Sequence, residues 1–166
     1  MWVFLFVFFN MKYSVLTKEQ LIALHEEFSK FLATQQIDAA EWTKIKKEKP
    51  EVADEEIAVF SDLVWEGVLK KVQYLDHISE HHINLFKCEE ATISRLFIKL
   101  NDTSKNFLVK EDFDWFINNP LHESIDYFRA TKNYEVERNM ELFKLIEMGS
   151  VISNGDLYNA INQLTD

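Results

Sequence analysis

The sequence predicts a helix-rich α+β fold with a small, mainly antiparallel sheet, in the order ααα-ββ-α-β-αα. Its 166 residues include only three Gly and two Pro, and a scarcity of turn-forming residues indicates long elements. Apolar residues recur at helical spacing in the first half of the chain and again near its end. Between these regions the spacing changes to a period of two, which is typical of strands.

The N-terminal half begins with two capped helices. In the first, the Thr17 hydroxyl can accept a hydrogen bond from the amide of Gln20, and the Gln20 side chain can return it in a capping box. Asp38 and Glu41 repeat this spacing at the start of the second helix. Pro50 ends the second helix, because the residue before a proline disfavours helical geometry.

A third helix is predicted from about residue 50 or 54 to about residue 75. It carries an apolar stripe that includes Phe60, and the first helix carries one that includes Phe28, so we expect these two faces to dock. Gly67 lies at the edge of the stripe. Because glycine costs about 1 kcal/mol in a helix interior, we interpret it as a point of close helix approach.

Strands and further helices follow in the C-terminal half. The predicted elements are strands at residues 83–88 and 96–100, a helix at 110–118, a strand at 125–131, a helix ending at Gly149 and a helix beginning near residue 153. We expect residues 11–166 to form a single domain, and the only candidate sub-boundary lies near residues 76–82.

The first ten residues differ from the rest. Residues 1–9 are wholly apolar, but spanning a bilayer takes about 20 apolar residues. They also lack the basic residues and the cleavage site of a secretory signal. We therefore interpret residues 1–10 as an apolar extension from a mis-assigned start, with Met11 as the true start. The alternative is a membrane or interfacial anchor.

Composition excludes several classes of protein. The 28 acidic residues outnumber the 18 basic ones and give a net charge of −10, which argues against a dedicated nucleic-acid binder. A single cysteine, Cys88, excludes an internal disulfide and fits a reducing, cytoplasmic compartment. No phosphate-binding glycine loop and no G-x-S-x-G nucleophile motif occurs.

Three motifs give the chain a resemblance to a known family. Residues 11–166 resemble a small family of uncharacterised bacterial proteins, a domain of unknown function. The resemblance implies a cytoplasmic bacterial protein and carries no activity. The motifs are Leu16-Thr-Lys-Glu-Gln-Leu21, Phe60-Ser-Asp-Leu-Val-Trp-Glu-Gly67 and Asn84-Leu-Phe-Lys-Cys88.

His77, His81 and His82 form the one cluster with metal-ligand character. If the third helix continued to residue 82, His77 and His81 would lie one turn apart, which suits two metal imidazoles. A zinc site needs three or four protein donors, however, and the sequence has no H-E-x-x-H motif that would supply a glutamate general base. We therefore favour a polar connection at the surface in which the three histidines are solvated. We expect no metal, no cofactor and no catalytic residue.

Other reactive or charged residues have structural interpretations. Cys88 is predicted to be a buried strand cysteine whose thiol pKa the neighbouring Glu89 and Glu90 would raise. His25 borders an apolar face and is predicted to be half-buried and hydrogen-bonded. The lysines within residues 44–49 are predicted to form a solvated helix face that pairs with the acidic residues after it.

The end of the chain has a weaker resemblance. Residues 143–157 resemble the first two helices of a winged-helix domain, but no Lys or Arg follows Lys144. A recognition helix needs such cations, so DNA binding through this region is excluded.

Two function classes follow from these observations. The first is a non-enzymatic protein-protein interaction or accessory module with an unidentified protein partner, supported by Trp42, Trp65 and Trp115 beside the apolar stripes. Those side chains would equally serve to widen the core. The alternative is a metal-dependent enzyme built on the histidine cluster. A concave pocket with convergent polar groups would favour the enzyme, and a flat exposed aromatic patch would favour the interaction module.

Overall fold

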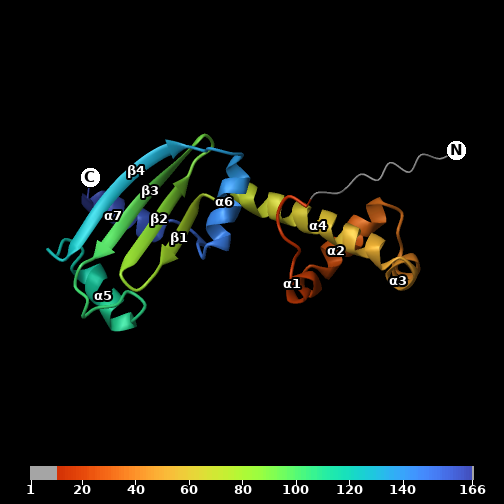
Figure 1. The fold of residues 1–166 in the computed structure, drawn as a ribbon, viewed down its shortest axis with the longest axis horizontal. Helices are drawn as coiled ribbons and strands as arrows, with labels where there is room; N and C mark the ends of the chain where they lie inside the picture. The colour runs from red at the N-terminus through yellow and green to blue at the C-terminus, as the bar shows by residue number, and fades with distance from the viewer. Residues whose placement is uncertain (1–10, 166) are drawn as a thin grey trace. The chain divides into compact units, whose positions relative to one another are not determined.

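The computed structural model describes residues 11–165 and divides the chain into two compact units (Figure 1). The units are Met1–Val68 and Leu69–Asp166, so the division falls inside one helix. Within residues 11–165 the chain forms seven helices and five strands. The predicted helix-rich α+β class with a small antiparallel sheet is therefore confirmed. The interpretation of residues 1–10 lies outside the described residues.

The N-terminal unit consists of helices. They are α1 (Lys18–Ala23), α2 (His25–Thr34), α3 (Ala39–Glu48) and the part of α4 (Pro50–Lys71) up to residue 68. The Thr17 side chain accepts a hydrogen bond from the Gln20 amide in a complete capping box, and Asp38 accepts one from the amide of Glu41. Both predicted helix starts are confirmed, because capping depends only on residues three positions apart.

One predicted helix is divided in two. The stretch after Thr17 breaks at Leu24, where the backbone adopts φ −103° and ψ 24° between α1 and α2. The Leu24 amide still donates to the Gln20 carbonyl at 3.0 Å, so the chain kinks without losing that helical hydrogen bond. Leu24 is neither Gly nor Pro, and the break therefore has no local sequence signal.

Aromatic rings hold the N-terminal unit together. The Phe28 ring lies 5.0 Å from the ring of Phe60 and 5.3 Å from that of Trp42, while the Phe31 ring lies 5.5 Å from Phe60. Phe60 is 4% exposed. The predicted docking of the Phe28 face on the Phe60 face is confirmed, and the half-buried Trp42 packs against the same core.

A short extended segment also packs on α4. The Asp62 carboxylate accepts hydrogen bonds from the amides of Lys12 at 2.7 Å and Tyr13 at 2.9 Å. The Tyr13 hydroxyl donates to the Glu66 carboxylate at 2.5 Å. Burial, followed by this hydrogen bond, raises the pKa of Tyr13 to about 12, so the hydroxyl remains protonated. Residues 12 and 13 are thus part of the folded unit.

The C-terminal unit is built around one five-stranded sheet of order β4-β3-β2-β1-β5, in which all neighbours are antiparallel. The strands are β1 (Tyr74–Ile78), β2 (His82–Cys88), β3 (Thr92–Leu100), β4 (Ile125–Asn133) and β5 (Val151–Ser153). The helices that follow them are α5 (Lys110–Asn118), α6 (Arg138–Glu147) and α7 (Asp156–Thr165).

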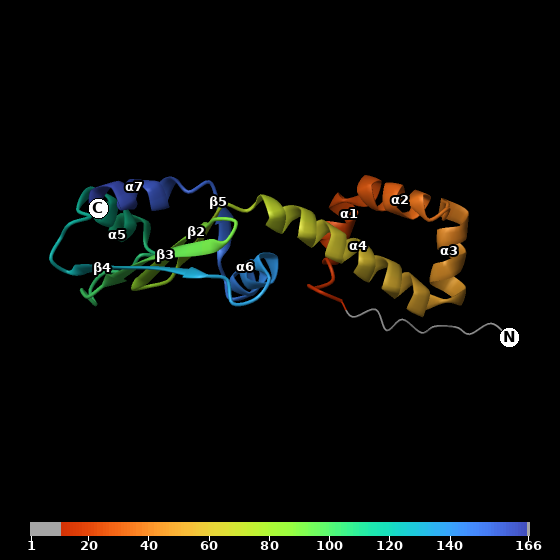
Figure 2. The same ribbon diagram turned by 90° about the horizontal axis from the view of Figure 1, so that it is seen from above.

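The strand register separates two faces of the sheet. Ile83 pairs with Ile98 and Leu85 pairs with Leu96, and all four side chains are at most 1% exposed. Because side chains alternate along a strand, this face carries the hydrophobic core. Helices α5 and α7 cover it through buried residues such as Phe116 (Figure 2).

Two strands were not predicted. The third predicted helix ends at Lys71 rather than near residue 75, and β1 begins at Tyr74. Strand β5 lies between α6 and α7, so the expectation of two consecutive helices there is wrong. The structure places the candidate joint at residues 76–82 in the β1–β2 hairpin. Gly149 follows α6 with φ +107°, which confirms it as the residue that ends this helix.

Gly67 and Gly155 differ in the space that each would leave for a side chain. A Cβ atom on Gly67 would meet nothing within 4 Å, so the predicted close helix approach there is wrong. At Gly155 the backbone has φ +83°, and a Cβ atom would lie 2.5 Å from the Tyr74 ring. Only glycine fits this position, both for its backbone and for the space available.

Arg138 ties several backbone segments of the C-terminal unit together. Its guanidinium donates hydrogen bonds to the carbonyl oxygens of Leu69 (3.0 Å), Val72 (2.5 Å), Cys88 (3.1 Å) and Glu89 (3.0 Å). These acceptors belong to the end of α4, the segment after it, and β2 with its following turn. The first residue of α6 is therefore anchored to backbone carbonyl groups at the ends of α4 and β2.

Candidate binding site on the sheet face opposite the core

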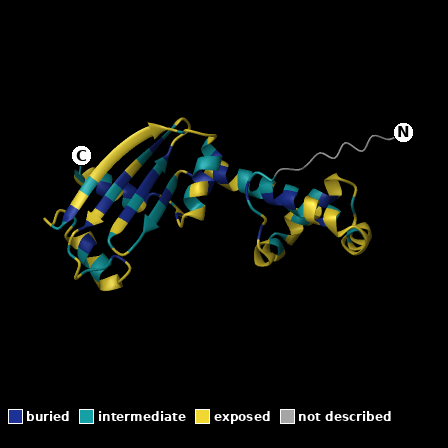
Figure 3. Cartoon of the chain, in the orientation of Figure 1, coloured by how far each residue is buried: buried dark blue, intermediate teal, exposed yellow. Residues whose placement is uncertain are grey.

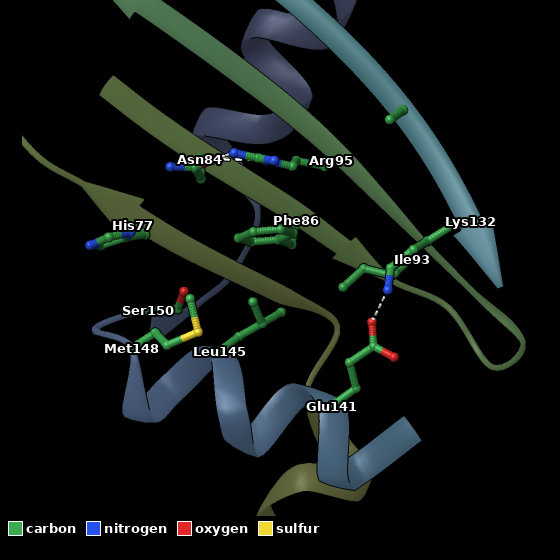
Figure 4. A pocket seen from close by; sticks show the side chains of 11 residues that line it. His77, Asn84, Phe86, Ile93, Arg95, Lys132, Glu141, Leu145, Met148 and Ser150 are labelled. Carbon is green, nitrogen blue, oxygen red and sulfur yellow. Dashed lines mark hydrogen bonds and ion pairs between the residues drawn. The ribbon is translucent and has the colours of Figure 1, made fainter. Parts of the chain in front are cut away.

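The second face of the sheet is only partly covered. Asn84 and Phe86 on β2, and Arg95 and Phe97 on β3, alternate with the core residues and so point away from α5 and α7. Helix α6 packs against one end of this face (Figure 4). Strand β4 is exposed along most of its length (Figure 3). The uncovered face is therefore the surface available for binding.

A pocket of about 420 Å³ opens between this face and α6 (Figure 4). Its walls combine strand residues with residues of α6 and of the segment after it. The lining residues are His77, Asn84, Phe86, Ile93, Arg95, Ala130, Lys132, Glu141, Leu145, Met148 and Ser150.

The centre of the pocket is apolar. Phe86 and Ile93 form the sheet wall, with exposures of 9% and 4%, and Leu145 and Met148 face them from the helix side (Figure 4). A Cβ atom on Gly149 would lie 3.3 Å from the His77 imidazole. The glycine therefore lets the chain after α6 pass close to the strand that carries His77.

Two polar pairs flank the apolar centre. The Arg95 Nε donates to the Asn84 side-chain oxygen at 2.8 Å, and a second guanidinium nitrogen donates to the same atom. Lys132 forms an ion pair with Glu141 at 2.5 Å. Burial has the largest single effect on the pKa of Glu141 and raises it, but the hydrogen bond and charge of Lys132, together with hydrogen bonds from the backbone amides of Glu135 and Val136, lower the pKa by more. The hydrogen bond to Glu141 raises the pKa of Lys132, so both groups stay charged near neutral pH.

Beside the pocket lies a row of contacting rings, which we name the aromatic patch: His82, Phe97 and Phe128. The His82 and Phe97 rings are 5.4 Å apart and nearly parallel, and the Phe97 and Phe128 rings are 5.8 Å apart. The Arg95 guanidinium lies 4.9 Å from the centre of the Phe97 ring. Phe128 is 53% exposed, an unusual position for a phenylalanine on a sheet.

The histidine cluster does not have the geometry that a metal pair would need. Because α4 ends at Lys71, His77 and His81 are not one helical turn apart; His77 lies on β1, His81 in the turn, and His82 on β2 against Phe97. Within residues 11–165 no group of three or more His, Cys, Asp or Glu side chains could hold a metal ion. Metal content itself stays a prediction.

Cys88 is buried in β2, as predicted. Burial raises the pKa of its thiol to about 12, against an opposing effect of the Arg138 charge. The raised pKa follows from burial rather than from the neighbouring glutamates. His25 is exposed, so the expectation that it is half-buried is wrong, although its Nδ1 lies 3.1 Å from the Ile22 carbonyl oxygen.

The tryptophans singled out in the sequence are not the residues that form the aromatic patch. Trp115 packs against the core cluster and meets the His122 ring at 5.1 Å, so it does not form a flat exposed surface. Sequence reasoning missed Phe97 and Phe128 as surface residues. The alternation that placed Leu96 and Ile98 in a strand also puts Phe97 on the opposite face, and that signal could have found it.

Comparison with known proteins gives a family but no activity. Residues 11–166 match a family of unknown function, DUF6495. The chain belongs to DUF6495. The match covers both compact units and all three motifs on which the predicted resemblance rests, and that prediction is confirmed. No curated protein and no solved structure matches this DUF6495 chain. Within residues 11–165, no helix combines the length and apolar character needed to cross a membrane.

Proposed function

We propose that this DUF6495 protein is a non-enzymatic protein-protein interaction module, an accessory protein of the bacterial cytoplasm. Its aromatic patch is the proposed surface for a protein partner. One observation carries the proposal: a row of contacting rings, including the 53% exposed Phe128, lies on a sheet face that α6 covers only at one end. An exposed aromatic patch favours an interaction module over an enzyme, because large exposed apolar patches mark surfaces that bind other proteins.

Physical properties of the patch suit a binding hot spot. Each ring contacts the next, with His82 stacked on Phe97 and Phe128 tilted against Phe97. These contacts restrict the side chains, so less entropy is lost when a partner covers them. Arg95 stacks on Phe97 at the edge of the patch, and arginine and aromatic residues are enriched at interface centres. A partner that covered Phe128 would remove a large apolar area from water, which favours association.

The pocket beside the patch has the concave shape that would favour an enzyme, and its chemistry argues against that function. A carboxylate such as Glu141, which has a lowered pKa and an ion pair with Lys132, is a weak general base near neutral pH. Cys88 does not line the pocket; it is buried, and a thiol with a pKa of about 12 holds almost no thiolate nucleophile. These properties support binding rather than catalysis.

The charge of the chain supports a protein partner over a nucleic acid. A net charge of −10 repels the phosphate backbone. A single buried, free cysteine suits the reducing cytoplasm. Fractionation of the native bacterium, followed by immunoblotting of each fraction, checks the location; recovery in the periplasm or the membrane would contradict it.

The proposed surface is tested by affinity capture from the native cell with the full chain as bait. The variant Phe128→Ser removes the exposed ring, and Leu121→Ser is the matched control because Leu121 is 68% exposed in the segment after α5. We expect at least one protein to be captured by the wild type and by the control but lost with Phe128→Ser. An identical set of captured proteins from all three baits, at equal melting temperature, would contradict the proposal.

A further inference from the structure

The three arginines of the chain are used in different ways. Arg138 is bound to backbone carbonyls, and Arg129 donates to Asn162 and Thr165 at the end of α7. Arg95 lines the pocket, and among residues 11–165 it donates only to the side-chain oxygen of Asn84. An arginine offers five N–H donors, so the Asn84 contact orients the guanidinium while donors remain for another acceptor.

Arg95 also lacks a compensating charge. Within residues 11–165 no carboxylate lies at ion-pair distance from its guanidinium, although the chain carries 28 acidic residues. The other strand cation of the pocket is compensated, since Lys132 pairs with Glu141 at 2.5 Å and with Glu135 at 3.2 Å. The positive charge that is left for a ligand is therefore at the Arg95 end of the pocket.

The rest of the pocket favours an apolar group. Phe86 and Ile93 are almost fully buried on the sheet side, and Leu145 faces them from α6 (Figure 4). A volume of about 420 Å³ lies within the range of small-molecule sites, which typically combine apolar walls with a few placed polar groups. It exceeds what one acidic side chain of a partner would fill.

We propose that this pocket binds a small organic monocarboxylate with an apolar body. Its carboxylate accepts hydrogen bonds from the Arg95 guanidinium, and its body packs between Phe86, Ile93 and Leu145. A guanidinium and a carboxylate match in geometry and charge, and a single guanidinium compensates one negative charge. The inference goes beyond the proposed function, because it concerns the pocket rather than the aromatic patch.

The first test compares three probes of equal chain length on the full-length protein. Octanoate, 1-octanol and octylamine are titrated separately, and NMR follows the methyl groups of Ile93, Leu145 and Met148 together with Ala130. We expect saturable shifts at these methyls with octanoate, at least about tenfold weaker binding of octanol, and none with octylamine. Equal binding of octanoate and octanol, or no saturable shift with any probe, would overturn the inference.

Variants then localise the carboxylate. Arg95→Gln removes the proposed donor, and Lys99→Gln is the matched control because Lys99 is exposed on the same face of β3, four residues from Arg95, and does not line the pocket. Both lower the net charge equally. We expect Arg95→Gln to weaken octanoate binding at least about tenfold and Lys99→Gln to change it less than about twofold. Equal losses in both variants would overturn the assignment.

Two further variants separate the pocket from the aromatic patch. Ala130→Phe places a large side chain into the pocket and should block octanoate, whereas Phe128→Ser should leave octanoate binding within about a factor of two. Loss of octanoate binding in Phe128→Ser, with an unchanged melting temperature, would overturn the pocket as the site. Conversely, failure of octanoate to bind leaves the capture experiment on Phe128→Ser as an independent test of the proposed function.

Discussion

The two faces of the sheet in the C-terminal unit differ in what covers them. On one face, Leu85 and Ile98 are fully buried beneath α5 and α7. On the other, Phe86 and Ile93 are buried where α6 packs, yet Phe128 is 53% exposed. Both faces carry large apolar residues, but only the first is closed. The difference separates the part of the sheet that stabilises the fold from the part that is free to bind.

The largest expected effect concerns the closed face. Phe116→Ala removes a fully buried ring that meets Phe107 at 5.1 Å and Phe113 at 5.9 Å. We expect it to lower the free energy of unfolding by about 3–5 kcal/mol, the cost of a large core cavity. Urea denaturation followed by circular dichroism measures it. A loss below about 1 kcal/mol would mean that this face is not the main core.

A second comparison uses two glycines. Gly155→Ala forces a Cβ atom toward the Tyr74 ring at a position with φ +83°, and we expect a loss of about 2–4 kcal/mol from overpacking and backbone strain. Gly67→Ala is the control, since nothing lies within 4 Å of its Cβ position on the exposed surface of α4. It should raise stability by about 0.5–1 kcal/mol. Thermal unfolding of both variants measures the contrast, and a shift of the same sign in both would contradict it.

The ion pair between Lys132 and Glu141 at the rim of the pocket makes the stability of the protein depend on pH. The pKa of Glu141 is lowered below its usual value of 4.5, because burial, the largest single effect, raises it by less than the Lys132 hydrogen bond and charge and two backbone amide hydrogen bonds together lower it. A carboxylate with a depressed folded-state pKa stabilises the protein above its unfolded pKa, and that contribution is lost as pH falls through the folded pKa. Glu141→Gln should therefore reduce the fall in melting temperature on acidification below about pH 5. An unchanged fall in the variant would remove Glu141 from this role.

The smallest expected effect on stability concerns the open face. Phe128→Ala removes a ring that is half in water and contacts only the neighbouring ring Phe97 among the described aromatic pairs. We expect a loss of no more than about 1 kcal/mol in urea denaturation. A loss as large as that of Phe116→Ala would show that the two faces contribute equally to the fold.

Local signals explain which parts of this fold the sequence predicts. The caps at Thr17 and Asp38 and the docking of Phe28 on Phe60 follow from spacings of three, four and seven residues. The β2–β3 pair follows from strict alternation. Strand β5 has only three residues, too few for a period to appear, and Leu75 of β1 also fits the helical stripe of α4.

The pocket and the open face of the sheet depend on contacts that no local pattern contains. The pocket exists because α6 lies against one end of the sheet, and α6 is anchored there by Arg138 through carbonyls of Leu69 and Val72, more than sixty residues away in sequence. Phe97 could be placed on an outward face by alternation, but whether a helix covers that face cannot be read from spacing. The same is true of the Arg95–Asn84 contact, which requires the β2–β3 register.

The central claim is that the open face recognises a protein partner while the closed face maintains the fold. The most direct measurement is the affinity of Phe128→Ser for a protein recovered in the capture experiment, made beside its free energy of unfolding. The account predicts an affinity loss of at least about tenfold with the unfolding free energy changed by no more than about 1 kcal/mol. An unchanged affinity, or an affinity loss explained by an unfolded variant, would contradict it.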